Sequence, residues 1–244
     1  MDALKKIYRR QERAWKNRKS LLRRTTLKHP PRVLYIGCVD ARLDPIGDIG
    51  FDRGQTFIFR NIAALVRKDK RGVAAPDWRT LPGNGEIPEN TSIGSMLELF
   101  LKHVPLKSGK IKHIIIAGHT DCAGLKTCQH QNFLMDDHYL PLHLKSLQPA
   151  RTRIMAEAKI KGWNDGQILQ ALEEASVRES ITNLQSYPIV QRAIKEGTLK
   201  IHGWILDTET HLILEMNPES LAFEPMATHT PKVLETYRQL RARL

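Results

Sequence analysis

Two short apolar runs along the chain each end at a glycine that is followed by polar, chemically reactive side chains. The first run covers residues 33–36 and ends at Gly37, and the second covers residues 113–117 and ends at Gly118. Neither run alternates with polar positions, which is typical of strands that are buried on both faces of a parallel sheet. We therefore predict two parallel strands whose carboxyl ends carry the polar residues of VLYIGCVDAR and AGHTDC.

Further segments have the pattern of strands. Residues 56–60 form a short apolar run after a loop that contains proline and glycine. Residues 199–206 and 211–216 are two more runs, and the turn between them at residues 207–210 predicts an antiparallel hairpin. We expect this hairpin at the edge of the sheet.

Apolar residues recur with helical spacing elsewhere in the chain. This pattern predicts amphipathic helices over residues 92–104 and 179–195 and a C-terminal helix over residues 233–244, with Thr230 and Pro231 at its start. Residues 129–175 are polar and also rich in helical pattern. Strands that alternate with helices predict an α/β fold: a mostly parallel central β-sheet flanked by helices, with an antiparallel edge hairpin and an extended N-terminal helical arm.

The N-terminal arm combines an apolar stripe with basic residues. The stripe recurs at intervals of three, four or seven residues and consists of Leu4, Ile7, Tyr8, Ala14, Trp15, Leu21 and Leu22. We favour the interpretation that this helix packs across a partner subunit, because a tryptophan in the stripe gains from burial. A contact of the basic face with nucleic acid or anionic lipid is the alternative.

The net charge of +12 is concentrated in that arm. Residues 1–32 contain twelve Lys or Arg and only two acidic residues, so they supply +10, whereas the remaining 212 residues are close to neutral. This distribution argues against a nucleic-acid-binding role for the whole protein. We expect residues 1–32 to be a basic helical arm for oligomerisation and residues 33–244 to be a single α/β domain.

Composition agrees with an ordinary enzyme of one domain. The 244 residues are 41% hydrophobic and 26% charged, and no run of 18 apolar residues or secretory signal core is present. Three cysteines, two of them expected at a metal, leave Cys128 unpaired, which suits a reducing compartment. The expected location is therefore the cytoplasm, with no transmembrane segment.

Cys38, His119 and Cys122 are the candidate metal ligands. They follow the glycines that end the two buried runs, so the predicted parallel strands should bring them together. Two sulfurs and one imidazole suit zinc and leave a fourth tetrahedral position open, as in catalytic sites. Each residue alone is explained more simply as part of the core, and it is their shared placement that favours a metal site.

The order of these motifs resembles the β-class carbonic anhydrases. C-V-D-A-R is followed 81 residues later by H-T-D-C, and LYIGCVDARLDP, GQTFIFRNIAALV, IKHIIIAGHTDCAG and GTLKIHGWILD occur in the order of that family. The resemblance covers roughly residues 30–207. It implies one Zn²⁺ per chain on Cys38, His119 and Cys122, and reversible hydration of carbon dioxide to bicarbonate and a proton.

Asp40 and Arg42 are the candidate catalytic residues. If the chain stays extended, Cys38, Asp40 and Arg42 lie on one face. We expect Asp40 to orient a zinc-bound hydroxide and Arg42 to keep Asp40 ionised, which are the roles that the family assigns to these positions. Two thiolates neutralise the zinc charge, so such an acceptor should be useful.

The chain departs from the family pattern at two candidate substrate-binding positions. His29 stands where a Gln is frequent, and Ala123 stands where a Gly is common. Imidazole can still donate a hydrogen bond, and Ala123 keeps its N–H but adds a methyl group that narrows access. We do not expect the family's regulatory bicarbonate site. That site uses three positions, and this chain matches the family only at Arg60.

Several alternatives stay open from the sequence alone. A narrower pocket on the same fold suits hydrolysis of carbonyl sulfide or carbon disulfide. A non-catalytic zinc module with a nucleic-acid-binding arm is a different class, but no fourth Cys or His lies near either motif. The expected partners are carbon dioxide or bicarbonate and a second chain, in a homodimer or dimer of dimers. A weak contact of the arm with an anionic surface is the alternative role for that segment.

Smaller roles are also expected for other polar residues. We expect Arg60 and Asn61 to fix neighbouring loops by hydrogen bonds and Asp121 to cap the helix that follows it. The three histidines between residues 129 and 145 have no ligand spacing and are expected at the solvated surface: His130, His138 and His143.

Overall fold

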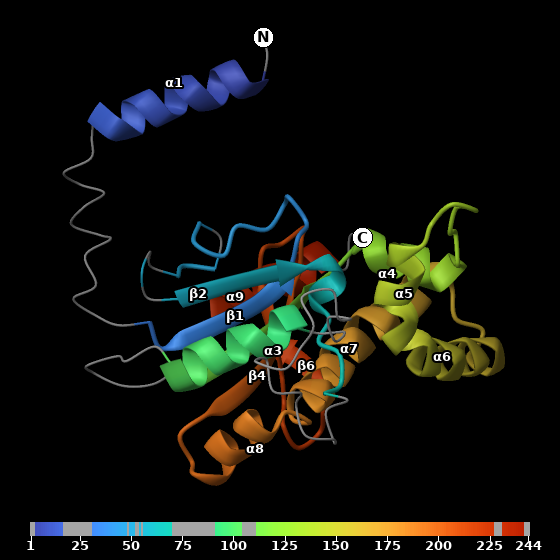
Figure 1. Ribbon diagram of the computed structural model, residues 1–244. Coiled ribbons are helices and arrows are strands. Elements are labelled where there is room, and N and C mark those ends of the chain that lie inside the picture. Colours follow the sequence, from blue (N-terminus) through green and yellow to red (C-terminus); the bar gives the residue numbers. More distant parts are fainter. Residues whose placement is uncertain are drawn as a thin grey trace.

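The computed structural model describes residues 3–16, 31–47, 49–51, 54, 56–69, 91–103, 111–226 and 231–241. Within these ranges the expected α/β architecture is confirmed (Figure 1). The central sheet has six strands in the order β2-β1-β3-β4-β5-β6. Its strands are β1 (Val33–Cys38), β2 (Thr56–Asn61), β3 (His113–His119), β4 (Lys200–Leu206), β5 (Ile213–Met216) and β6 (Phe223–Pro225).

Four neighbouring strands are parallel and two are antiparallel. β1 pairs with β2 and β3, and β3 pairs with β4, all in parallel. β5 and β6 run antiparallel at the far edge, which confirms the hairpin and adds a third short strand that the sequence pattern did not predict. Because β1 and β3 are adjacent and parallel, their carboxyl ends meet at the same edge of the sheet.

Helices connect and cover the strands. They are α1 (Ala3–Lys16), α3 (Thr91–Glu98), α4 (Ala123–His130), α5 (Tyr139–Leu144), α6 (Gln148–Lys161), α7 (Asp165–Leu184), α8 (Pro188–Lys195) and α9 (Pro231–Arg241), with shorter turns η1 (Ile62–Ala64), η2 (Leu99–His103) and η3 (Lys145–Leu147). The expected helix over 92–104 is present as α3 and the wider π-helical turn η2. The C-terminal helix begins at Pro231, and Thr230 lies outside the described residues.

The predicted continuous helix over residues 179–195 is wrong. α7 ends at Leu184 and α8 starts at Pro188, with Tyr187 in an extended conformation between them. Proline has no backbone N–H and disfavours a helical conformation at the preceding residue, so Pro188 begins a helix instead of continuing one.

The two faces of the sheet have different cores. On the face covered by α3, α7 and α8, Leu34, Ile36 and Ile116 pack against helix residues such as Val177 (Figure 1). On the opposite face, Tyr35 and its neighbours pack against the aromatic rings of Phe51 and Trp204. β1 and β3 are buried along nearly their whole length, as their uninterrupted apolar runs predict.

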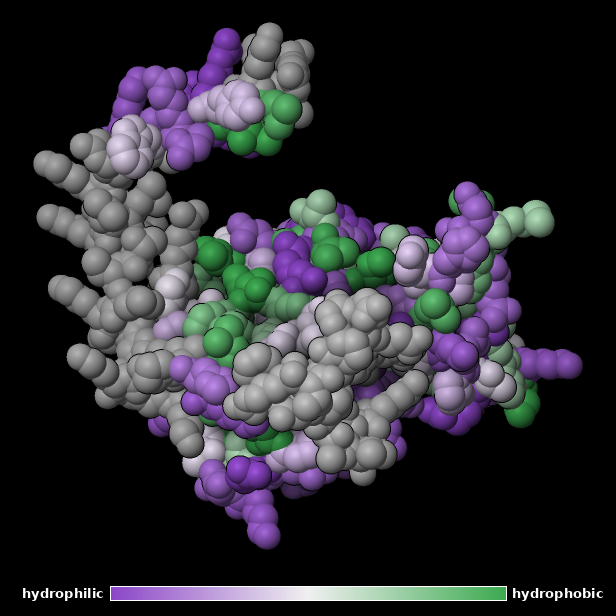
Figure 2. All heavy atoms as spheres, in the orientation of Figure 1, coloured by the Kyte–Doolittle hydropathy of each residue, from purple (hydrophilic) through white to green (hydrophobic). Residues whose placement is uncertain are grey.

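α1 lies apart from the sheet and its helices, and hydrophobic side chains on it are exposed (Figures 1 and 2). Ile7 is 54% exposed and Trp15 is 61% exposed. Hydrophobic side chains also gather over β2 in the space-filling view, and Ile58 of that strand is 39% exposed. Leu21 and Leu22 of the predicted stripe lie outside the described residues.

None of the helices that the structure describes combines the length and apolar character that a membrane crossing requires.

Candidate metal centre

The structure brings Cys38, His119 and Cys122 together at the carboxyl edge of the sheet. Cys38 is the last residue of β1, His119 is the last residue of β3, and Cys122 follows after a two-residue turn as the N-cap of α4. One donor atom from each lies within 4.8 Å of the others, and all three residues are buried. In the described part of the chain this is the one such group of three that could hold a metal ion.

The hydrogen bonding of His119 prepares one ring nitrogen for a metal. Its Nδ1 lies 2.9 Å from the backbone oxygen of Thr120, and because a carbonyl only accepts, Nδ1 must carry the proton. Nε2 then has a free lone pair, and it is buried without a hydrogen-bond partner among the residues that the structure describes. A buried, unpartnered imidazole nitrogen that faces two sulfurs fits a metal ligand whose other nitrogen is fixed by the backbone.

The two thiols differ in acidity because they lie side by side. The neighbouring Cys122 thiol, and to a lesser degree His119, hold the pKa of Cys38 well below its usual range, although burial acts in the opposite direction. The Cys38 thiolate, together with burial, raises the pKa of Cys122. Only one of the two thiols is therefore readily ionised, unless a bound cation offsets the negative charge of a second thiolate. A soft dication such as Zn²⁺ fits this set of donors.

Asp40 and Arg42 form a bidentate pair beside the three ligands. Arg42 Nε donates to Asp40 Oδ1 at 3.0 Å, and Arg42 Nη2 donates to Asp40 Oδ2 at 2.8 Å. These hydrogen bonds hold the pKa of Asp40 well below its usual range. Asp40 Oδ2 also lies 3.8 Å from His119 Nε2, so an ionised carboxylate adjoins the place where a metal would sit.

The local backbone differs from the expected extended conformation. β1 ends at Cys38, and the Arg42 N–H turns back to donate to Asp40 Oδ1 at 2.9 Å. The expectation that Cys38, Asp40 and Arg42 share one face of an extended strand is therefore wrong. An aspartate that accepts the N–H two residues later makes a turn, which the spacing of two residues also allows.

Asp121 does not cap the following helix as expected. The N-cap of α4 is Cys122, and no side chain caps this end. Asp121 instead has a left-handed backbone with φ of 61°, and its Oδ2 accepts from Arg42 Nη1 at 2.8 Å. Its carboxylate also contacts Lys126, so Arg42 joins the two ligand-bearing loops through Asp40 and Asp121.

The end of β2 and the turn after it support the loop of Cys38. Arg60 Nε donates to the Cys38 carbonyl at 2.7 Å, and its Nη2 donates to the Asp40 carbonyl at 2.5 Å. Asn61 closes its own turn by exchanging hydrogen bonds with Leu65. Both residues thus fix neighbouring loops, as expected. The Ala63 N–H also donates to Cys38 Sγ at 3.3 Å, a contact that stabilises a thiolate.

Glu173 is a buried carboxylate near the centre that the sequence interpretation missed. It lies on α7, is 3% exposed, and its Oε1 accepts from the Cys122 N–H at 3.2 Å. Burial raises the pKa of Glu173 to about 7. The N–H groups of Cys122 and Asp121 act in the opposite direction, because their hydrogen bonds favour the ionised carboxylate. The sequence does contain a signal for it, because Glu173, Val177 and Ser180 have the spacing of one helical face.

The remaining candidates have different surroundings. His29 lies outside the described residues, and Ala123 is exposed at the start of α4. Cys128 is buried at 1% exposure, within the core around Leu125 and Leu144.

Of the three histidines expected at the surface, His130 and His138 are exposed. His143 is partly buried, and its Nε2 lies 2.9 Å from the Ile62 carbonyl. The prediction that His143 is solvated is therefore wrong. The Ile62 carbonyl offers its ring a hydrogen-bond acceptor inside the protein.

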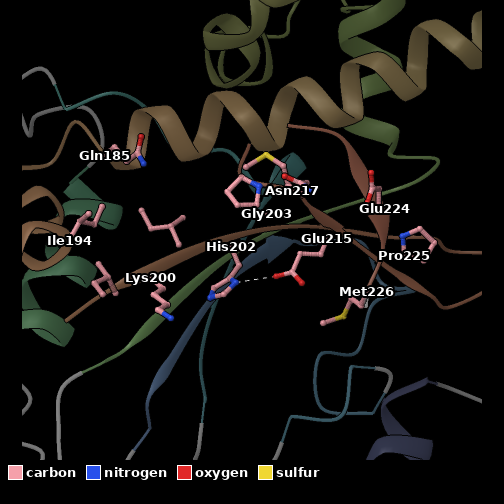
Figure 3. A pocket seen from close by; sticks show the side chains of 14 residues that line it. Gln185, Ile194, Lys200, His202, Gly203, Glu215, Asn217, Glu224, Pro225 and Met226 are labelled. Atoms are coloured by element: carbon pink, nitrogen blue, oxygen red, sulfur yellow. Dashed lines mark hydrogen bonds and ion pairs between the residues drawn. The ribbon is translucent and has the colours of Figure 1, made fainter. Parts of the chain in front are cut away.

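A cavity of about 620 Å³ lies away from the candidate metal centre, among β4, β5 and β6 (Figure 3). Its polar lining includes His202, whose Nδ1 lies 3.1 Å from Glu215 Oε1, together with Lys200 and Asn217. No cysteine and none of the three candidate ligands line it. The chemistry of the donor atoms, and not the size of this cavity, therefore identifies the candidate site.

Comparison with protein families and known proteins gives one consistent match. The family model described as carbonic anhydrase matches residues 33–213. The chain is 29% identical over 191 residues to a carbonic anhydrase of Synechococcus elongatus. This aligned region covers 78% of this chain but only 61% of that protein. It is 25% identical over 228 residues to a carbonic anhydrase of Helicobacter pylori, covering 88% of this chain and 90% of that protein.

Solved structures share the fold. The β-carbonic anhydrase CcaA matches with a TM-score of 0.72 and 22% identity, over 92% of this chain and 100% of that chain. One structure of the tetrameric β-carbonic anhydrases from Sordaria macrospora matches with a TM-score of 0.68 and 21% identity, over 88% of this chain and 98% of that chain.

Proposed function

Because the chain belongs to the β-class carbonic anhydrase family, we propose that it catalyses the reversible hydration of carbon dioxide to bicarbonate and a proton. The single observation that carries the proposal is the convergence of Cys38, His119 and Cys122, with His119 Nε2 buried and lacking a hydrogen-bond partner within the described ranges. In the proposal these three side chains hold one Zn²⁺ per chain. When bound, zinc would supply a Lewis acid that lowers the pKa of a water molecule.

The ligand residues prepare this site through their own contacts. The Thr120 carbonyl fixes the tautomer of His119, and the Ala63 N–H donates to the Cys38 sulfur. Such contacts orient the ligands before a metal arrives, and they usually matter for metal affinity.

Asp40 is the proposed acceptor for a hydrogen bond from the reacting water, which it orients, and Arg42 keeps Asp40 ionised. The bidentate contact uses both carboxylate oxygens, and Oδ1 also accepts the Arg42 backbone N–H, so Oδ2 is the oxygen that retains a lone pair for a further hydrogen bond. Since Arg42 lowers the pKa of Asp40, the carboxylate is charged throughout the neutral range and can accept a hydrogen bond. Its position 3.8 Å from His119 Nε2 supports this role.

Substrate selection is proposed to involve the surroundings of Ala123 and His29. The exposed Ala123 at the start of α4 is close in sequence to Cys122, and its methyl group would narrow access where the family usually has glycine. Carbonyl sulfide or carbon disulfide hydrolysis is the competing activity, because both molecules are linear and need the same chemistry. The family membership favours carbon dioxide.

Assembly and location complete the proposal. The exposed hydrophobic residues of α1 support a role for residues 1–32 as an arm that packs on a second copy, in a homodimer or a dimer of dimers. The three unpaired cysteines support a reducing compartment, in keeping with the expected cytoplasmic location.

Stopped-flow measurement of carbon dioxide hydration, with metal analysis on the same sample, tests the proposal. The zinc-loaded protein should accelerate hydration far above the uncatalysed rate and should turn over carbonyl sulfide and carbon disulfide much more slowly. Rapid turnover of either sulfur compound by zinc-loaded protein that leaves carbon dioxide hydration unchanged would establish the competing activity instead.

A further inference from the structure

A buried carboxylate beneath the metal-binding turn has no role in the proposed reaction. Glu173 is 3% exposed, and in the part of the chain that the structure describes it forms no ion pair with a Lys or Arg. Burying an ionisable group without such a partner is costly unless hydrogen bonds compensate. The compensation comes from the metal-binding turn, where the Cys122 N–H donates to Glu173 Oε1 at 3.2 Å.

The turn that receives this contact has an unusual backbone. Asp121, directly before Cys122, is left-handed with φ of 61°, a conformation that side-chain-bearing residues seldom adopt. Before it, the Thr120 N–H donates to the Leu206 carbonyl at 3.0 Å. After it, the Cys122 carbonyl accepts the first N–H groups of α4. Glu173 holds the N–H of Cys122 between these two attachments.

The position of Glu173 is itself well determined. α7 packs directly on β3 and β4, and a Cβ atom at Gly118 would lie only 2.8 Å from Val177 Cγ2. The helix therefore approaches β3 as closely as a glycine permits, one residue before His119. In addition, Ser176 Oγ donates to the Glu173 carbonyl at 2.8 Å inside the core. A rigid helix thus presents the carboxylate to the turn.

We propose that Glu173 is a positioning residue for the metal centre, which fixes the backbone of Cys122 and thereby the place of its sulfur relative to Cys38 and His119. This inference rests on the proposed function in one respect, because it takes these three residues as the zinc ligands. A carboxylate that merely tethered α7 to the turn would affect folding stability, whereas a positioning residue also affects zinc affinity.

Two substitutions of similar volume separate these roles. Glu173→Gln keeps an oxygen that accepts the Cys122 N–H, and Glu173→Met fills the same space without an acceptor. Zinc affinity is measured by competition with a chelating dye, and thiolate-to-cobalt charge-transfer bands of the Co²⁺-loaded protein report whether both sulfurs bind. We expect Glu173→Gln to bind zinc nearly as the wild type does, and Glu173→Met to bind about 10- to 100-fold more weakly with reduced charge-transfer intensity.

Glu174→Met is the matched control. Glu174 is the next residue on α7 but pairs with Arg178 at 2.6 Å, away from the turn. This variant should lose some stability without any change in zinc affinity. If Glu173→Met fails to fold, Glu173→Asp is measured in its place. Aspartate keeps the negative charge, but its side chain is one methylene shorter, so the acceptor oxygen lies farther from the Cys122 N–H. Zinc affinity should therefore still fall.

Wild-type zinc affinity in Glu173→Met, or in Glu173→Asp where that variant is used, would overturn the inference. An equal loss in Glu173→Gln and Glu173→Met would also overturn it, because charge and not a hydrogen-bond acceptor would then be what matters. The underlying ligand assignment fails separately: it is refuted if Cys122→Ser binds zinc as tightly as the wild type, whatever the Glu173 variants do.

Discussion

Arg42 is the side chain that joins the two halves of the candidate metal centre. Its guanidinium binds both oxygens of Asp40, which follows β1, and also the carboxylate of Asp121, which follows β3. A planar fork of donors is suited to such bridging, and lysine could not reproduce it. The geometry therefore couples Asp40, the proposed hydrogen-bond acceptor, to both ligand loops.

Replacing Asp40 by Asn should abolish most activity while leaving the metal in place. The substitution removes the charged acceptor and the ionic partner of Arg42, but none of the three ligands. We expect carbon dioxide hydration to fall by about 100-fold or more, a typical loss when a positioned acid or base is removed, with zinc content unchanged. Near-normal hydration by the zinc-loaded variant would refute the role given to Asp40.

Asp121→Asn is the matched control for this experiment. Asp121 and Arg42 have side chains about half exposed, 49% and 46%, and exposed ion pairs contribute only about 0 to 1 kcal/mol. Because Arg42 keeps its bidentate contact with Asp40, activity should fall by less than about tenfold.

The ligand residues could be foreseen from the sequence, but their contacts could not. Cys38, His119 and Cys122 follow apolar runs whose parallel pairing brings them together. The partners of Asp121 and Glu173 depend on how α7 and the two loops pack, which no local spacing encodes. Glu173 lies in an apolar helical stripe, but the helix was predicted to begin at residue 179, so its place on the buried face was missed.

The close packing of α7 on β4 depends on a glycine in the strand. A Cβ atom at Gly203 would lie 2.9 Å from Ile181 Cδ1 and 3.2 Å from Met216 Cβ. Gly203→Ala should therefore destabilise the protein by about 1 to 3 kcal/mol, as overpacking usually does. Denaturant unfolding measures the change, and zinc content should stay the same because the contact is distant from the ligands.

Ile181→Val tests whether that contact is the cause. This substitution removes the Cδ1 atom that the new methyl group would meet. In the double variant the two losses should be clearly less than additive. Additive losses would mean that Gly203→Ala acts through something other than the contact with Ile181 Cδ1.

A histidine pair across β3 and β4 should make stability depend on pH. His113 Nδ1 lies 3.0 Å from His202 Nε2, while His202 Nδ1 faces Glu215. Burial, followed by the nearby His202, Lys200 and Lys112, lowers the pKa of His113. A histidine with a lowered pKa in the folded state contributes stability above its ordinary pKa of 6.5, and this contribution is lost as the pH falls below that value.

Comparison of His113→Asn with the wild type between pH 7.5 and 5 measures this contribution. The wild type should lose more thermal stability on acidification than His113→Asn does, because the variant lacks the group whose protonation favours unfolding. His130→Asn alters an exposed histidine and serves as control. An equal loss in the wild type and His113→Asn would contradict the expected linkage.

The helices and strands were predictable to different degrees. The long apolar runs of β1 and β3 specify buried strands, and the hairpin of β4 and β5 follows from two runs around a turn. β6 has only three residues, too few for a pattern, and depends on pairing with β5. The break between α7 and α8 was missed because the apolar periodicity continues across Pro188, although a proline predicts a boundary there.

The exposed apolar face of α1 is the feature that most clearly calls for a second copy of the chain. Ile7 and Trp15 are more than half exposed, which is unfavourable for large hydrophobic side chains that repeat along one helix. The basic residues of the arm lie between these positions in sequence and can remain solvated. We therefore expect α1 to pack on a partner subunit through its apolar stripe.

Deletion of residues 1–28 should weaken assembly. Sedimentation at micromolar concentration should show a dimer or larger species for the full chain and a lower mass for the truncated one. Ile7→Ser with Trp15→Ser should act like the deletion, whereas Arg9→Gln with Arg13→Gln should leave the assembly intact. A full-length protein that sediments as a monomer would contradict this role for the arm.

Zinc titration of metal-free protein, with carbon dioxide hydration followed by stopped flow at each addition, addresses function and metal together. We expect the rate to rise in proportion to bound zinc and to level off at one zinc per chain, and the Cys122→Ser protein to show no such rise. A hydration rate that does not respond to zinc, or that reaches its plateau equally in Cys122→Ser, would contradict a carbonic anhydrase site on Cys38, His119 and Cys122.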